Sequence, residues 1–340
     1  MVFCFFKVKK YALDFFLFLT ESCEGRKPMK QRLTMKKDTK ITVEEAYGLF
    51  EKKAKVKNLS ENTLRTYKYH FDSFIKCIDK SRQLSSISSE DIDDFILYLK
   101  NDCKIKPVTI NSYLRTIRVF LYYCMDCGYL KRFRISTIRV DKAIKETYTA
   151  NELKNLLQKP DVTKCTFSEY KAWVFENYLI GTGNRISSAL NLKIKDIDFE
   201  GGTLLIRKTK NRKQQIIPLS ATLGNILREY LEIRSGAPDD YVFCNDFGEQ
   251  GTRRSYQQLV QKYNLKRNVN KTSCHLFRHT FAKQWILAGG DIVRLQKILG
   301  HCDLEMTKEY LQMFGQDLQM DFEKFNPLDR MQSDKKHIRM

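Results

Sequence analysis

Apolar residues recur at three- and four-residue spacing through most of residues 42–134, and this periodicity limits the possible folds more than any other feature. Such spacing gathers the apolar side chains on one face of an α-helix. Polar residues suited to capping, such as Ser60, separate the stripes, and Pro107 stands where a first helical turn tolerates proline. We therefore predict a small helical bundle. Its expected core includes Leu64, Tyr67, Phe71, Phe74, Ile75, Ile78, Ile92, Phe95, Ile96, Leu99, Ile110, Leu114, Ile117 and Leu121.

The second half of the chain is also helical, with one β signal. Two β-prone runs in Thr203–Pro218 flank Lys210–Lys213, which predicts a β-hairpin with a strongly basic tip. Thr149 and Glu152 have the spacing of a capping box, so a new helix should begin there. The expected fold is mainly α with a small β-hairpin or sheet. We divide the chain into an N-terminal extension at 1–40, a helical domain at 41–135, a linker at 136–148, a second domain at 149–326 and a polar tail at 327–340.

The chain is strongly basic, with 60 Lys and Arg against 40 Asp and Glu and a formal net charge of +20. A field of this sign attracts polyanions, of which nucleic acid is the commonest. The alternative is a basic surface that serves solubility, and for any single lysine or arginine an ordinary solvated position. Basic residues three apart share a helix face, and a basic hairpin tip adds to them. The residues expected to contact DNA phosphates are Arg65, Lys68, Arg115, Arg118, Lys208, Arg212 and Lys213.

The ten cysteines are scattered, and the one close pair, Cys124 and Cys127, lies in an apolar helical pattern. This distribution indicates a reducing cytoplasm and no disulfide framework. The apolar N-terminus is interrupted by charges and has no run of the roughly 20 residues that a membrane span needs. A signal peptide is a weaker alternative, because no clean small-residue cleavage site follows. We expect translation to begin at Met29 or Met35, since organised sequence starts near Ile41.

A cluster of basic and imidazole side chains ends in a tyrosine near the C-terminus. His275 and Arg278 are three apart on one expected helix, so both can reach one ligand. His301 follows a second apolar helical run, and Tyr310 comes nine residues later. Upstream, Arg185 opens an otherwise apolar helix after a glycine-rich turn. These residue types suit the binding of a phosphodiester and its attack by a hydroxyl.

This cluster has two other interpretations, a zinc site and a set of core residues. His275 and His279 superficially resemble the HExxH zinc motif, but Leu276 stands where the motif needs glutamate and Arg278 would repel a cation. We therefore predict no metal, and interpret Cys274, His279 and Cys302 as packing residues. A core interpretation fits Phe281, Trp285 and Ile286 as well as His279. It fits His275, Arg278 and His301 poorly, because buried unpaired charge is costly.

Together these motifs resemble the tyrosine site-specific recombinases, the phage integrase and Xer family. The resemblance covers about residues 42–325 and rests on Arg185 in TGNRIS, His275-x-x-Arg278-His279, Leu299-Gly300-His301 and Tyr310. It implies an N-terminal core-binding domain of the SAM-like type and a C-terminal catalytic domain. Counting back from Ile217-Pro218-Leu219, the family's catalytic lysine matches Lys210, with Lys208 and Lys213 as alternatives. Where the family often has an acidic residue that supports the site, this chain has Ser188.

The resemblance implies an enzyme that breaks and rejoins DNA through a covalent 3′-phosphotyrosine, without ATP, metal or other cofactor. Tyr310 would be the nucleophile, Arg185 and Arg278 would hold the phosphate oxygens, and Lys210 would protonate the departing 5′ oxygen. His275 and His301 would donate hydrogen bonds or move protons. The expected partner is double-stranded DNA, bound by a homotetramer on two sites. The tail from Leu311 to Phe325 would dock on a neighbouring protomer, or else pack on its own domain.

Two alternatives remain from the sequence alone: a non-catalytic DNA-binding regulator on the same scaffold, and a type IB topoisomerase. The complete set of expected site residues argues against the first, and the recombinase-type N-terminal domain argues against the second. Integration, excision and dimer resolution are not distinguished. Because only about 40 residues precede the bundle, too few for an independent arm-binding domain, we expect a simple recombinase, Xer-like or carried by a mobile element.

Overall fold

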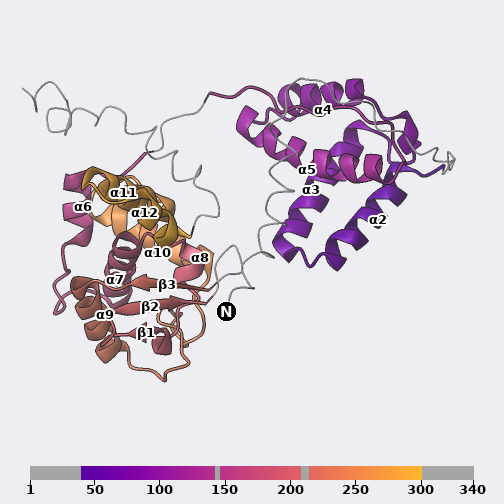
Figure 1. Cartoon of the computed structure of the whole chain (residues 1–340). Coiled ribbons are helices and arrows are strands. Elements are labelled where there is room, and N and C mark those ends of the chain that lie inside the picture. The colour runs from indigo at the N-terminus through magenta and orange to yellow at the C-terminus, as the bar shows by residue number, and fades with distance from the viewer. Residues whose placement is uncertain (1–39, 142–145, 208–213, 301–340) are drawn as a thin grey trace, which may run out of the picture. The chain divides into compact units, whose positions relative to one another are not determined.

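A computed structural model describes residues 40–141, 146–207 and 214–300 (Figure 1). The chain divides into two compact units, Met1–Asp141 and Lys142–Met340, and each is treated by itself. The described parts match the predicted class, mainly α with one small sheet. Among the helices of the described residues, none is both long enough and apolar enough to cross a membrane.

The N-terminal unit is a helical bundle, as its apolar periodicity predicts. Side chains cap its first two helices: Thr42 and Ser60 accept hydrogen bonds from the backbone N–H groups of Glu45 and Thr63. Pro107 occupies the first turn of its helix. The elements are α2 (Val43–Val56), α3 (Glu61–Cys77), the 3₁₀ turn η1 (Leu84–Ser86), α4 (Ser89–Asn101) and α5 (Pro107–Asp126).

Aromatic rings fill much of the core of this bundle. Tyr47 of α2 stacks on Phe71 of α3 with ring centroids 3.7 Å apart, and Phe120 of α5 meets Phe71 edge-on at 5.5 Å. Phe74 and Phe95 also meet edge-on at 5.1 Å, which joins α3 to α4. Burying each such side chain contributes about 1.5–3 kcal/mol, so these contacts hold the helices in register.

One histidine is part of this core. His70 of α3 is 7% exposed, and its Nδ1 lies 2.8 Å from the Thr116 hydroxyl of α5. Its ring stacks on Tyr113 at 4.0 Å. Burial lowers the pKa of His70 below its ordinary value, because the charged imidazolium is poorly solvated there. His70 is therefore a neutral packing residue at physiological pH.

The C-terminal unit is built around α7. This helix carries buried residues on all sides, as expected for a helix enclosed by its neighbours, and it packs against α6, α9, α10 and α11. The helices are α6 (Ala150–Leu157), α7 (Phe167–Thr182), α8 (Ile186–Ala189), α9 (Ala221–Arg234), α10 (Arg253–Lys266), α11 (Cys274–Leu287) and α12 (Ile292–Leu299), with the 3₁₀ turn η2 (Ile194–Asp196).

A three-stranded antiparallel sheet in the order β1-β2-β3 completes this unit (Figure 1). β2 (Thr203–Ile206) and β3 (Gln215–Pro218) form the predicted hairpin, with Thr203 opposite Pro218 and Ile206 opposite Gln215. The short β1 (Ile197–Asp198) was not predicted, because two residues are too few to show an alternating pattern. The apolar sides of β2 and β3 contribute Leu204, Ile206 and Ile217 to the main core.

The segment predicted as a linker, residues 136–148, is attached at both ends. Ile138 exchanges two hydrogen bonds of 2.9 Å with the Asn111 side chain of α5. Tyr148 is 2% exposed in the core of the C-terminal unit, and its N–H donates to Thr280 Oγ1 at 2.9 Å. The division between the units falls between Asp141 and Lys142. The extension at 1–39 and the tail beyond residue 300 lie outside the described residues.

Candidate active site

The turn that carries Arg185 is shaped by glycine. Gly183 ends α7 in the left-handed conformation, with φ at 63°. A Cβ at this position would lie 2.6 Å from Phe281 Cδ1 of α11 and 2.9 Å from Leu299 Cδ2 of α12. Only glycine allows the end of α7 to approach both helices so closely. Arg185 follows as the N-cap of the short helix α8 and is half-buried.

Arg278 ties this turn to the end of α12. It lies on α11 and is only 4% exposed. Its Nη1 donates to the Gly183 carbonyl at 2.9 Å, and its Nη2 donates to the Leu299 carbonyl at 2.8 Å. Both carbonyls belong to helix C-termini, where backbone oxygens lack intrahelical donors and the helix dipole favours a cation. The buried charge is thus stabilised, and one side chain connects three segments that are distant in sequence.

His275 lies one turn before Arg278 on α11. Its backbone N–H donates to Ser273 Oγ, the N-cap of the helix, at 3.3 Å. The imidazole is exposed, and its ring centroid lies 6.3 Å from that of His279, which is half-buried. His275 and Arg278 thus lie three residues apart on one helix, as predicted, and Arg278 is buried whereas His275 is exposed. Phe281, Trp285 and Ile286, which we interpreted as core residues, are partly buried against Leu295 and Leu299.

Three predicted catalytic residues, Lys210, His301 and Tyr310, lie outside the described residues, as do Lys208, Arg212 and Lys213. The last described residue, Gly300, ends α12 in the left-handed conformation with φ at 61°. Ser188, at the family's frequent acidic position, is 6% exposed in α8. Among the described residues, no group of three or more His, Cys, Asp or Glu side chains is arranged to hold a metal ion.

The predicted DNA-contacting residues of the N-terminal unit lie on α3 and α5. Arg65 and Arg115 are exposed and Arg118 is half-buried, and none of them forms an ion pair with another described residue. Lys68 is exposed but already engaged: its Nζ lies 2.9 Å from Asp72 Oδ1 and sits over the Tyr47 ring. An exposed ion pair between lysine and aspartate is weak, so it does not prevent Lys68 from contacting a phosphate.

Comparison with known families adds two matches along the chain. Residues 146–316 match the model of the phage integrase family, and residues 47–127 match that of the phage integrase N-terminal SAM-like domain. The first match alone covers half of the chain.

This chain belongs to the phage integrase family of tyrosine recombinases. The resemblance seen in the sequence is confirmed, and so is the pairing of a SAM-like domain with an integrase catalytic domain. The protein is therefore an enzyme of the tyrosine recombinase class.

Relatives and solved structures agree with this assignment. The tyrosine recombinase XerD of Listeria innocua serovar 6a is 26% identical over 284 residues, which cover 80% of this chain and 94% of that protein. The Tn1549 transposon integrase in complex with transposon right end DNA shares the fold, with a TM-score of 0.66, 22% identity and coverage of 79% and 94%. A lambda integrase tetramer bound to a Holliday junction has a TM-score of 0.64 at 15% identity, with coverage of 80% and 78%.

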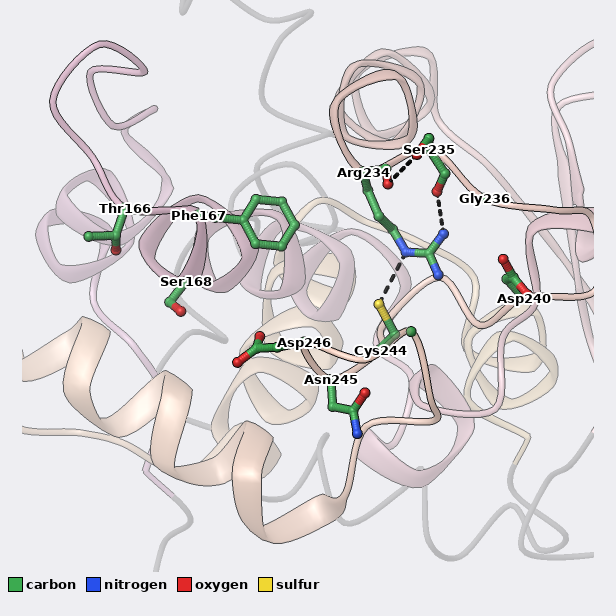
Figure 2. A pocket seen from close by; sticks show the side chains of 11 residues that line it. Thr166, Phe167, Ser168, Arg234, Ser235, Gly236, Asp240, Cys244, Asn245 and Asp246 are labelled. Atoms are coloured by element: carbon green, nitrogen blue, oxygen red, sulfur yellow. Dashed lines mark hydrogen bonds between the residues drawn. The ribbon is translucent and has the colours of Figure 1, made fainter.

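The catalytic unit of this integrase-family chain also has a pocket of about 540 Å³ whose described lining includes none of the predicted catalytic residues (Figure 2). Phe167, at the start of α7, faces Arg234 at the end of α9 and the loop that follows Cys244. Arg234 Nε donates to Cys244 Sγ at 3.2 Å. The pocket therefore lies where two helix ends meet a loop.

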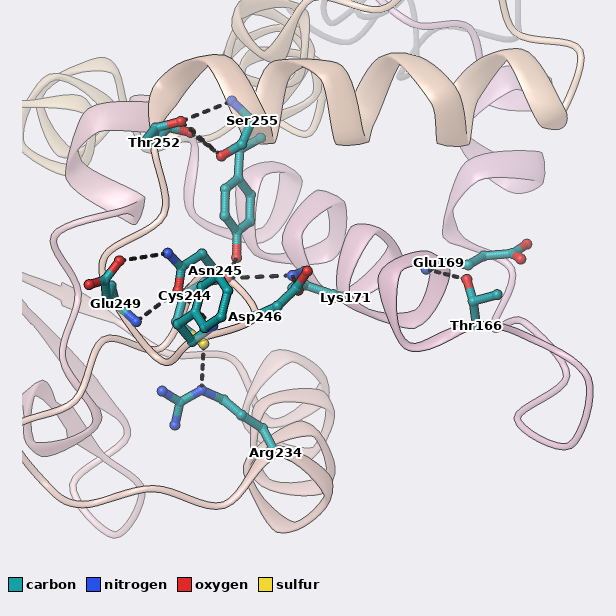
Figure 3. Close-up of polar contacts among 12 residues, drawn as sticks. Thr166, Glu169, Lys171, Arg234, Cys244, Asn245, Asp246, Glu249, Thr252 and Ser255 are labelled. Atoms are coloured by element: carbon teal, nitrogen blue, oxygen red, sulfur yellow. Dashed lines mark hydrogen bonds and ion pairs between the residues drawn. The ribbon is translucent and has the colours of Figure 1, made fainter.

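Polar contacts hold that loop in place (Figure 3). The Lys171 side chain of α7 is 7% exposed, and its Nζ lies 3.3 Å from Asp246 Oδ1. The Cys244 carbonyl accepts from the Tyr256 hydroxyl at 3.0 Å, and Asn245 pairs with Glu249 across the loop. These contacts attach the loop to α7 and α10, so we assign them a structural role.

Proposed function

We propose that the protein is a site-specific DNA recombinase that cleaves and rejoins strands through a 3′-phosphotyrosine on Tyr310. The observation that supports this most is the position of Arg278. Its two carbonyl contacts bring the Arg185 turn against the end of α12, directly before Gly300 and His301. The segments that carry Arg185 and Arg278 thus meet the end of α12, which supports a shared phosphate site.

The chemistry follows from the residue types. The Tyr310 oxygen attacks phosphorus, the bond from phosphorus to the 5′ oxygen breaks, and the tyrosine proton passes to a histidine, His301 or His275. Lys210 supplies a proton to the departing 5′ oxygen. Because the phosphotyrosine bond replaces a phosphodiester bond, rejoining by a 5′ hydroxyl reverses these steps without ATP.

Two arginines stabilise the charge that develops on the non-bridging oxygens. A guanidinium has five N–H donors in a rigid plane, and the Gly183 and Leu299 carbonyls engage two of those of Arg278. These contacts fix the orientation of the guanidinium before DNA binds, so little reorganisation is needed in the transition state. Arg185, at the N-cap of α8, would approach the same phosphate from the neighbouring segment.

We further propose that the enzyme acts as a tetramer on two DNA sites and serves the integration or excision of a mobile element. The lambda integrase tetramer on a Holliday junction and the Tn1549 integrase on transposon DNA share this fold and support such an assembly. The segment Leu311–Phe325 would link protomers, and basic side chains of α3 and α5 would contact DNA phosphates. Sites of covalent attachment mapped on genomic DNA should cluster at the ends of an element. Covalent attachment at a single chromosomal locus where chromosome dimers are resolved would instead indicate a Xer-type role.

The test of the reaction uses a DNA duplex nicked just beyond the scissile phosphate, so that the short 5′-hydroxyl fragment diffuses away and rejoining is blocked. Wild-type protein should form a covalent adduct that survives denaturation, and Tyr310→Phe should bind the same DNA without forming one. Binding without an adduct in both proteins would show a non-catalytic regulator. Relaxation of supercoiled plasmid without site preference would show a topoisomerase.

A further inference from the structure

The C-terminal turn of α12 is held by side chains from two other elements. Gln215 Nε2 donates to the Lys297 carbonyl and, at 2.8 Å, to the Ile298 carbonyl. Arg278 Nη2 donates to the next carbonyl, that of Leu299, at 2.8 Å. The final carbonyls of a helix lack intrahelical donors, and here three in succession accept from side chains. The end of α12, from which the chain continues to His301, is therefore fixed to β3 and to α11.

Gln215 also lies at the end of the β2–β3 pairing that is nearest to residues 208–213. It is the first residue of β3 and lies opposite Ile206, the last residue of β2. On the β2 side, Arg207 Nε donates at 2.5 Å to Oδ1 of Asp196, whose side chain is fully buried. The chain is thus anchored on both sides of residues 208–213, at Arg207 and at Gln215. One anchor is on η2 and the other is on α12.

The Gln215 amide fits closely against the end of α12. A Cβ on Gly300 would lie 2.7 Å from Gln215 Oε1, so a side chain at position 300 would require the amide to shift. Carbonyl oxygens can only accept, so the amide must present its NH₂ group to Lys297 and Ile298. A side chain without a donor would leave the Ile298 carbonyl without this hydrogen bond, whereas the Lys297 carbonyl would still accept from the Gly300 N–H at 3.0 Å.

We infer that Gln215 is a positioning residue for the reaction, an inference that rests on the proposed function. Lys210 precedes it by five residues and would protonate the 5′ oxygen, whereas His301 follows the helix end that Gln215 binds. Both groups must reach the same phosphate. Gln215 joins their two segments directly, so it sets where the hairpin lysine stands relative to the phosphate site.

The experiment compares Gln215→Ala with Gln214→Ala in the full chain on the nicked duplex. Gln214 is the adjacent residue of the same type and is exposed, so it is a matched control. We expect Gln215→Ala to form the adduct roughly 10- to 100-fold more slowly, the range expected for a misplacement of about 1 Å. DNA affinity and melting temperature should stay close to those of the control. Equal rates for the two variants, or a parallel loss of DNA affinity and folding, would overturn the inference.

A second substrate tests how Gln215 acts. Sulfur in place of the bridging 5′ oxygen leaves as a thiolate, which needs no proton donor because thiols are far more acidic than alcohols. On this substrate the defect of Gln215→Ala should largely disappear, as should that of Lys210→Ala, the reference for lost proton donation. A defect of unchanged size would show that Gln215 does not act through the lysine.

Donor chemistry provides the last comparison. Gln215→Arg keeps N–H donors and adds the cation that a helix C-terminus favours, so it should retain most of the rate. Gln215→Glu has nearly the same shape but places a carboxylate against two carbonyls, so it should be at least as slow as Gln215→Ala. The reverse order would contradict the assignment. If wild-type protein forms no adduct with DNA that it binds, the proposed function fails, independently of Gln215.

Discussion

At the scale of single residues, Arg278 shows why an arginine was required. One planar fork reaches carbonyls from two different helix ends, at Gly183 and Leu299, while remaining 4% exposed. A lysine ammonium is a point charge on a flexible stem and cannot span both acceptors in a fixed plane. The same side chain thus contributes to the packing of α7, α11 and α12 and to the predicted phosphate site.

We therefore expect Arg278→Lys to form the adduct about 100-fold more slowly or worse, as is typical when a preorganised donor to the transition state is removed. It should also lower the free energy of unfolding by about 1–3 kcal/mol, because at least one buried carbonyl loses its donor. Arg294→Lys, at an exposed position of α12, is the control and should change neither quantity measurably. The rate of adduct formation and the free energy of unfolding by chemical denaturation are measured for both variants. A fully active Arg278→Lys protein would refute the assigned role.

At the scale of elements, the site depends on where helices end. α7 ends at Gly183 and α12 ends at Gly300, both in the left-handed conformation, and the predicted residues Arg185 and His301 follow within two residues. Helix ends present free carbonyls and allow the chain to turn sharply. The two glycines therefore allow these helices to end immediately before the segments that carry the predicted catalytic residues.

Gly183→Ala should destabilise the C-terminal unit by roughly 2–4 kcal/mol, the sum of left-handed strain and overpacking against the Phe281 ring. Gly289 is the matched control in the same unit, since its φ is also positive at 75° but its Cβ would meet nothing within 4 Å. Gly289→Ala should cost only about 1 kcal/mol. Thermal unfolding measures the loss of stability in both variants, and the difference between them is the cost of overpacking at Gly183. Equal losses of stability would show that the close approach of α7 to α11 leaves room for a Cβ.

At the scale of the whole molecule, the two units carry buried titratable groups of opposite kinds. His70 in the N-terminal unit has a lowered pKa through burial. Glu176 on α7 is 0% exposed, and neither carboxylate oxygen has a hydrogen-bond partner among the described residues. Removal from water raises the pKa of Glu176 well above its ordinary value, and the charge of Arg267 opposes this shift only in part.

The signs give opposite pH responses. The unfolded N-terminal unit binds a proton on His70 below about pH 6.5 while the folded unit does not, so that unit should lose stability as pH falls. The folded C-terminal unit keeps the Glu176 proton that the unfolded chain releases above about pH 4.3, so that unit should lose stability as pH rises. Calorimetry across pH 5–8 should show that Glu176→Gln raises the melting temperature of the C-terminal unit at neutral pH and reduces its fall as pH rises. His70→Asn should reduce the fall of the melting temperature of the N-terminal unit as pH decreases. Unchanged pH profiles in both variants would contradict the linkage.

Much of the fold followed from local sequence signals, because each is set by a few neighbouring residues. Apolar periodicity predicted the N-terminal bundle and most of its core, although Leu64 is only half-buried and lies outside the core cluster. Capping residues such as Ser60 and Thr149 predicted where helices begin, and two β-prone runs predicted the hairpin. The family followed from motifs whose residue types are dictated by phosphate chemistry. The sequence did not predict β1, because a two-residue strand is defined only by its pairing with β2.

What the sequence determined by itself is therefore the set of chemical groups and the elements that carry them: Arg185 after a glycine turn, His275 and Arg278 on one helix face, and a basic hairpin. Only the tertiary structure decided how these segments are joined. Arg278 reaches carbonyls 95 and 21 residues away in the chain, and Gln215 reaches α12 across 82 and 83 residues. Neither contact leaves a local pattern, because a helix C-terminus accepts any donor that folding brings to it.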